Sequence, residues 1–180
     1  MRRLLGFGIG ALLLLTWSGA TADKKLDVCS LLTADEIASA TAQKVGPSRV
    51  MEIPISTGPY KGETMTACMW KLGETGMFSV NVIRMHVSAA EREQAVAKLR
   101  EGLNRAKAKG WTEEKQDFGD VKCVYMSPPS SGKKNLPTMT GCMGMAKGMG
   151  MSVGTMTGEG VTKVALAKIK ALFDKAGGRL

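Results

Sequence analysis

The segment 64–72 (TMTACMWKL), followed after a short glycine-bounded turn by the segment 77–85 (MFSVNVIRM), decides the fold class. In the second segment Phe78, Val80 and Val82 alternate with polar residues, which is the pattern of a strand with one buried face. The first segment is rich in threonine and apolar residues and has the length of a strand. Together the two segments predict an antiparallel hairpin.

Helix signals lie on both sides of this hairpin. The residues 33–36 (TADE) form a capping box, which predicts a helix extending to about residue 43. The residues 88–91 (SAAE) form a second capping box, opening a helix that extends to about residue 109. A third amphipathic helix is predicted from about residue 161 to residue 176, where Gly177 and Gly178 should end it.

The remaining segments predict further strands and loops. The stretch 51–62 contains Pro54, which restricts it to an edge strand. Residues 121–126 predict a strand, residues 127–137 an exposed loop, and residues 139–157 a hairpin. The order of elements hints at two similar αβββ-like halves. We therefore expect a single α+β domain over residues 23–180, with an antiparallel sheet, three helices and two disulfides.

The first 22 residues have the pattern of a secretory signal peptide. Arg2 and Arg3 form a basic start, and residues 4–17 form an apolar run that is too short to span a bilayer comfortably. Small residues at 20–22 (ATA) predict cleavage before Asp23. The alternative is a retained membrane anchor. The signal peptide predicts a periplasmic or secreted protein without stable membrane insertion after processing.

The chain contains four cysteines, an even number that favours disulfides in an exported protein. Three pairings are possible, and the spacing favours local ones, Cys29–Cys68 and Cys123–Cys142. No C-x-x-C motif is present, which argues against a thioredoxin-type redox centre or a zinc knuckle. A reactive or metal-binding thiol is the functional alternative.

The formal net charge of the 180-residue chain is +9, and a basic protein can bind nucleic acid or anionic surfaces. The lysines and arginines are nevertheless spread along the predicted helices, and aromatic residues make up only 5% of the chain. A platform for stacking bases therefore does not emerge from the sequence. We expect no nucleic-acid partner, and we interpret the charge as solvated helix faces.

Short motifs resemble a group of small exported bacterial lipoproteins and periplasmic proteins of unassigned function. They are 29–33 (CSLLT) with Glu36, 67–70 (ACMW), 118–120 (FGD) and a hairpin at Lys147-Gly148. The resemblance extends loosely over residues 27–176. It implies an α+β fold, an envelope location and a first cysteine paired with the one before the aromatic residue. This chain departs from the group by lacking a lipidation cysteine and by its methionine content, and the resemblance brings no catalytic residues.

The sequence offers little for catalysis. His86 is the only histidine, so every mechanism that needs an imidazole must use it, and no G-x-S-x-G motif accompanies it. The acidic residues Glu113, Glu114, Asp117 and Asp120 flank predicted loops and strand starts, where solvated carboxylates are common. We therefore expect a non-enzymatic exported binding or accessory protein. Its partner would be another envelope protein or a small apolar ligand.

Methionine is the chemical peculiarity of the chain, with 13 residues. Met143, Met145, Met149 and Met151 lie around a predicted hairpin turn. With a three-residue turn at 146–148, Met145 would oppose Met149 and Met143 would oppose Met151, so that all four thioethers share one face. Soft thioethers select Cu(I) or Ag(I). An alternative function is therefore Cu(I) binding at this quartet, with no cofactor expected otherwise.

Two other interpretations of the quartet stay open. Methionine is a flexible filler of irregular cores, and the glycines at 144, 148 and 150 would lie on the opposite side of the hairpin. The methionines could therefore form the core of the protein. They could also form a pliable apolar surface for a ligand or partner.

Overall fold

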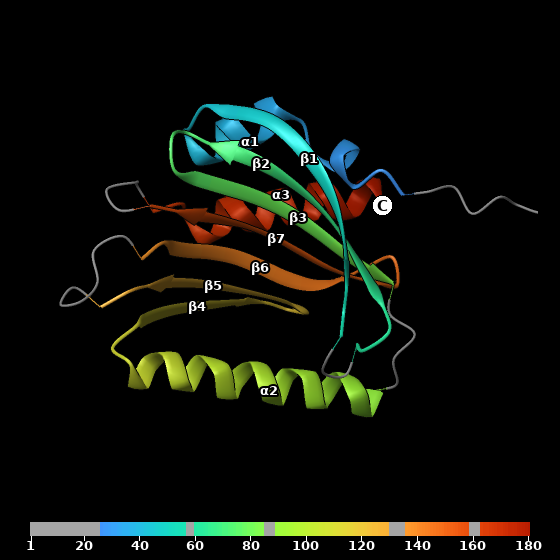
Figure 1. The fold of residues 1–180 in the computed structure, drawn as a ribbon, viewed down its shortest axis with the longest axis vertical. Helices are drawn as coiled ribbons and strands as arrows, with labels where there is room; N and C mark the ends of the chain where they lie inside the picture. Colours follow the sequence, from blue (N-terminus) through green and yellow to red (C-terminus); the bar gives the residue numbers. More distant parts are fainter. Residues whose placement is uncertain (1–25, 57–59, 85–88, 130–135, 159–162) are drawn as a thin grey trace, which may run out of the picture.

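A seven-stranded antiparallel sheet in the order β1-β2-β3-β7-β6-β5-β4 carries the fold (Figure 1). The computed structural model describes residues 26–56, 60–84, 89–129, 136–158 and 163–180. The strands are β1 (Val45–Pro54), β2 (Thr64–Leu72), β3 (Gly76–Arg84), β4 (Thr112–Phe118), β5 (Val121–Ser127), β6 (Thr138–Ala146) and β7 (Met149–Thr157). The helices are the 3₁₀-helix η1 (Val28–Leu31) and the α-helices α1 (Ala34–Thr41), α2 (Ala89–Ala108) and α3 (Leu166–Arg179).

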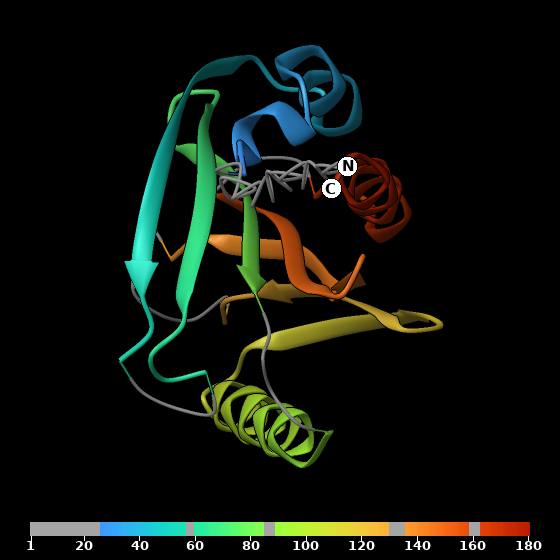
Figure 2. The ribbon, with the colours of Figure 1, turned by 90° about the vertical axis from the view of Figure 1, so that its right-hand side faces the viewer.

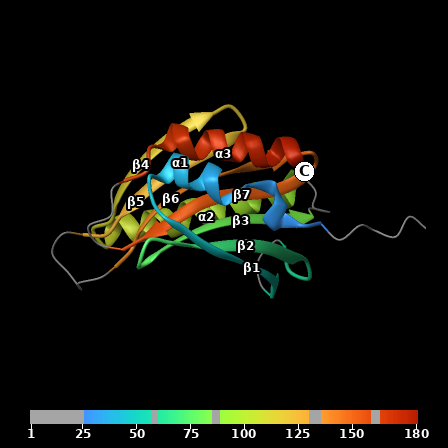
Figure 3. The same cartoon turned by 90° about the horizontal axis from the view of Figure 1, so that it is seen from above.

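One face of the sheet packs against η1, α1 and α3, and we call it the helix face (Figures 2 and 3). The alternation predicted for 77–85 is present, since Phe78, Val80 and Val82 are buried here. Ile169 and Phe173 of α3 complete this core. The opposite side of the sheet, called the second face, carries the residues that alternate with these along each strand. Helix α2 lies at the β4 end of the sheet, away from α1 and α3.

The α+β class, the antiparallel sheet, three α-helices and two disulfides are confirmed. The first half of the chain has three strands, β1 to β3, whereas the second half has four, β4 to β7. The additional strand is β4 (TEEKQDF), an edge strand that was not predicted from the sequence. Strand β1 also begins earlier than expected, because Gly46 and Pro47 lie in an irregular part of its register with β2. Both differences concern the polar edges of the sheet.

The capping box at the start of α1 is confirmed. The Thr33 hydroxyl accepts a hydrogen bond from the Glu36 amide (3.3 Å), and the Glu36 carboxylate accepts one from the Thr33 amide (2.9 Å). The second predicted capping box includes Ser88, which lies outside the described residues.

Helix α3 continues past the point where the sequence predicted its end. Gly177 and Gly178 lie inside the helix, which extends to Arg179. A Cβ atom at Gly177 would lie 3.1 Å from the Cβ of Ala146, so glycine allows the helix to approach the β6–β7 hairpin closely. Lys147 of that hairpin donates a hydrogen bond to the carbonyl oxygen of Gly178 (3.0 Å). Tertiary contacts therefore keep the two glycines helical.

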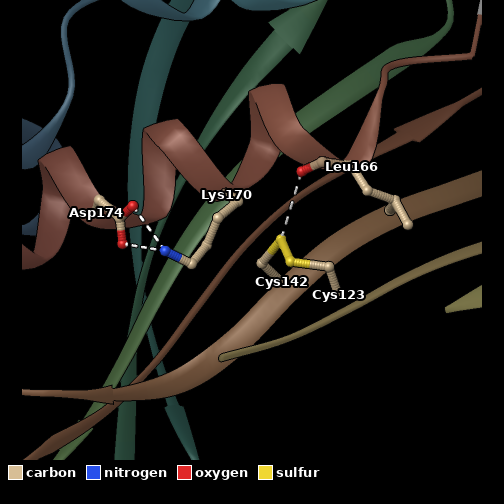
Figure 4. The surroundings of a disulfide bond; sticks show 5 residues. All are labelled: Cys123, Cys142, Leu166, Lys170 and Asp174. Atoms are coloured by element: carbon tan, nitrogen blue, oxygen red, sulfur yellow. Dashed lines mark hydrogen bonds and ion pairs between the residues drawn. A yellow bond between two sulfur atoms is a disulfide. The ribbon is translucent and has the colours of Figure 1, made fainter. Parts of the chain in front are cut away.

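Both predicted disulfides, Cys29–Cys68 and Cys123–Cys142, are confirmed. Cys123 and Cys142 are direct cross-strand partners on β5 and β6, with their Cα atoms 4.0 Å apart. The bond lies beneath the start of α3, where the Cys142 sulfur is 3.9 Å from the carbonyl oxygen of Leu166 (Figure 4). All four cysteines are oxidised, which is typical of proteins in oxidising compartments.

Among the described residues, no helix is both long enough and apolar enough to cross a bilayer. The predicted signal peptide, residues 1–22, lies outside the described residues.

Candidate functional site: the second face of the sheet

The predicted geometry of the methionine quartet is wrong. The β6–β7 turn has two residues, Lys147 and Gly148, both with positive φ (47° and 77°), instead of three. Met145 therefore opposes Gly150, and Met143 opposes Ser152. Because the side-chain period of a strand is two, the shift by one residue divides the quartet between the two faces.

The two halves of the quartet have different surroundings. Met151 is 3% exposed and belongs to the core on the helix face, and Met149 packs against that core. Met143 and Met145 lie on the second face, where Met145 is 38% exposed. Core packing is therefore the right interpretation for one half of the quartet, and surface exposure for the other half.

The second face is rich in methionine far beyond this hairpin. Strand alternation places thioethers on it from β1, β2, β3, β5, β6 and β7. The methionines of this face are Met51, Met65, Met69, Met77, Met126, Met139, Met143, Met145 and Met156.

Four of these methionines form one continuous row across the sheet, which we call the methionine row. Met77 on β3 is the direct partner of Met156 on β7, Met156 of Met139 on β6, and Met139 of Met126 on β5. Directly opposite residues in antiparallel strands have their Cβ atoms about 4.5–5.5 Å apart. Each thioether of the row is therefore next to another one.

A polar centre and two glycines lie beside the methionine row. The Asn81 side-chain amide donates hydrogen bonds to the hydroxyls of Ser152 (3.1 Å) and Ser79 (3.3 Å). Gly154 and Gly141, which are cross-strand partners, follow next to the row on β7 and β6. In the described part of the chain, a Cβ atom at Gly141 would have only backbone atoms within 4 Å. At these two positions the second face carries no side chain.

Two cations border the methionine row at its β1–β2 end. Lys71 is the direct partner of Met77, and Arg49 is the direct partner of Met69. The Arg49 guanidinium also contacts the Met51 sulfur at 3.4 Å, which places it over this face. Both side chains are exposed, and in the described part of the chain neither forms an ion pair. This end of the face is positively charged.

An ion-paired carboxylate closes the opposite end of the row. Glu113 on β4 is the partner of Met126, and its side chain is only 1% exposed. Burial alone would raise the pKa of Glu113, but the ion pairs with Lys107 (2.6 Å) and Lys115 (2.8 Å) outweigh it and lower that pKa. Lys107 belongs to α2, so this ion pair connects the end of α2 to the edge of the sheet.

A separate open groove of about 450 Å³ lies between α1 and α3 on the outside of the helix layer. Glu36 forms part of its wall and is held by Arg179 and Lys175. The hydrogen bond from Arg179 and that from the Thr33 amide lower the pKa of Glu36 to about 2. Glu36 and Lys175 in this groove therefore already have partners within the protein.

The other candidate residues from the sequence do not form a site. His86 lies outside the described residues. Glu114 forms an ion pair with Lys163, and Asp117 forms one with Lys122 at 3.0 Å. Within the described segments, no three His, Cys, Asp or Glu side chains are grouped so that they could hold a metal ion.

The comparisons with known proteins bring no relative: no family model, no curated protein and no solved structure matches the chain.

Proposed function

We propose that the protein is an exported, non-enzymatic binding protein whose ligand surface is the second face of the sheet. The predicted signal peptide and the two disulfides support an exported protein. The observation that carries the proposal is the methionine row, flanked by Lys71 and Arg49 at one end. Flexible, polarisable thioethers are used at binding surfaces that must adapt to their ligand.

The ligand class follows from the two parts of this surface. The four side chains of the methionine row cross three strand spacings, about 14 Å, and provide a continuous apolar track. Lys71 lies opposite Met77, the first methionine of the track, and Arg49 lies opposite the nearby Met69. A negatively charged group at this end can therefore interact with two cations. We infer an anionic amphiphile, with its acidic head at Lys71 and Arg49 and its alkyl chain along the row.

Calorimetric titration with dodecanoate tests this function. We expect one molecule to bind per chain. Dodecyltrimethylammonium has an alkyl chain of nearly the same length and the opposite charge, and we expect it to bind at least about tenfold more weakly. Equal affinities for the two amphiphiles would contradict the proposed orientation of the head group.

A charge-matched pair of variants locates the site. Arg49→Gln/Lys71→Gln should weaken dodecanoate binding by about tenfold or more. The control Lys44→Gln/Lys168→Gln removes the same charge from exposed positions before β1 and on α3, and it should bind like the wild type. Equal losses in both variants would mean that only net charge matters. An envelope protein that binds this face while dodecanoate does not would replace the amphiphile by a protein partner.

A further inference from the structure

The methionine row also has the composition of a soft-metal site. Met77, Met156 and Met139 are consecutive neighbours on β3, β7 and β6, and their side chains point to the same side of the sheet. With Cβ atoms about 5 Å apart and three rotatable bonds in each side chain, the outer two thioethers can lean toward the central one. Three sulfur atoms can thus converge on one point above Met156.

The surroundings provide access and space for this convergence. Met156 is 39% exposed, and Met77 and Met139 are half-buried. Beside Met156 and Met139, the next positions on this face are Gly154 and Gly141, which carry no side chains that would compete for the space. Met126, the fourth member of the row, is only 7% exposed and forms the closed end. An ion can therefore approach the central thioether from solvent.

We propose that Met77, Met139 and Met156 bind one soft monovalent cation, Cu(I) or its surrogate Ag(I), through three thioether sulfurs. Neutral thioethers prefer these ions over Zn²⁺, Ca²⁺ or Mg²⁺. The four cysteines are all in disulfides, so no thiolate competes with this set. The site differs from the hairpin quartet, because neither Met149 nor Met151 lies on this face.

This inference does not rest on the amphiphile proposal. An alkyl chain needs an apolar surface with cations at its end, whereas the metal needs sulfur atoms. Leucine in place of methionine preserves the apolar surface and removes the sulfur. The two proposals can therefore fail separately.

Titration of the oxidised protein with Ag(I), in competition with a soluble thioether chelator, tests the site without redox chemistry. We expect one tightly bound Ag(I) per chain in the wild type. Met139→Leu/Met156→Leu should lose at least about tenfold in Ag(I) affinity. The matched control Met143→Leu/Met145→Leu removes two thioethers of the same face outside the row and should stay within about threefold of the wild type.

The methyl NMR signals of the methionines give a second readout on the unmodified protein. Ag(I) should shift the ε-methyl signals of Met77, Met139 and Met156, while those of Met51 and Met65 stay in place. Neutral thioethers need no deprotonation, so the Ag(I) affinity should be the same at pH 7 and pH 5. Equal loss of affinity in both leucine variants, shifts spread over the whole face, or a tenfold weaker affinity at pH 5 would each overturn the proposal.

Discussion

Arg179 forms a two-point ion pair with Glu36, with its Nη1 and Nη2 atoms each 2.7 Å from a carboxylate oxygen. The same guanidinium donates a hydrogen bond to the carbonyl oxygen of Leu31 (2.9 Å). The last turn of α3 is thereby fixed to both η1 and α1, which lie nearly 150 residues earlier in the sequence. Glu36 also closes the capping box with Thr33, so one carboxylate stabilises the start of α1 and the end of α3.

Glu36→Gln should destabilise the protein by about 1–2 kcal/mol at pH 7, because it weakens the ion pair and the capping box together. The pKa of Glu36 is lowered from 4.5 to about 2 in the folded protein. A lowered carboxyl pKa stabilises the folded state above pH 4.5, and this contribution disappears as the pH falls toward 2. Urea unfolding of both proteins at pH 7 and pH 2.5 should therefore give a difference that shrinks at the lower pH.

Asp174→Asn is the control for this experiment. Asp174 pairs with Lys170 four residues earlier on the exposed side of α3 (Figure 4). Loss of this pair should cost less than about 0.5 kcal/mol. A difference between wild type and Glu36→Gln that stays constant from pH 7 to pH 2.5 would contradict the role assigned to Glu36.

Gly154→Ala should destabilise the protein by about 1–3 kcal/mol, because its Cβ would lie 2.7 Å from the backbone oxygen of Thr140. Gly141→Ala is the matched control on the facing strand, where the nearest atom would be 3.5 Å away, an ordinary contact. Its unfolding free energy should change by less than about 0.5 kcal/mol. Thermal unfolding of the two variants measures their stabilities. Equal destabilisation by the two substitutions would contradict the conclusion that only Gly154 is too crowded for a Cβ atom.

Removal of either disulfide by a double cysteine-to-alanine substitution should cost about 3–4 kcal/mol. Loss of Cys29–Cys68, which closes a loop of 39 residues, should cost about 0.6 kcal/mol more than loss of Cys123–Cys142, which closes one of 19 residues. Urea unfolding of the two variants tests the order. A larger cost for Cys123–Cys142 would mean that its packing beneath α3 outweighs loop length.

Glu113→Gln should loosen the attachment of α2 to the sheet. The substitution removes the negative charge that holds Lys107 of α2 and Lys115 of β4, at a cost of about 1–2 kcal/mol. Amide hydrogen exchange should accelerate in the last turns of α2 and stay unchanged in α3. Asp117→Asn is the control. Asp117 lies on β4, like Glu113, but it is exposed and pairs with Lys122 of β5, so its substitution should leave amide exchange in α2 unaltered.

The central strands and the cap of α1 could be predicted because each is a local pattern. The alternation around Phe78 and Val80 fixes their burial, and the box from Thr33 to Glu36 fixes the start of α1. Strand β4 was not predicted because its residues are mostly polar. It lies at the edge of the sheet, where a strand does not need alternating hydrophobic residues. An edge strand of this kind is defined by its partner β5 more than by its own residues.

The candidate site was only partly predictable, because it depends on one turn. Lys147 adopts φ 47°, a conformation that lysine rarely takes and that asparagine would have indicated. The glycine that follows it was a signal for a two-residue turn. With that turn, Met139 and Met156 become partners, but the contributions of Met77 and Met126 require the order of strands in the sheet, which the sequence does not contain.

Because the methionines are divided between the two faces, exposed and buried methionines should be oxidised at two different rates. Peroxide converts methionine to a polar sulfoxide at a rate that depends on exposure. Met145 and Met156 on the second face would be modified while the sheet stays intact, whereas Met151, enclosed in the core, is protected for as long as the protein remains folded. A sulfoxide at Met151 therefore records that a molecule has unfolded, and one at Met156 records only that it has met an oxidant.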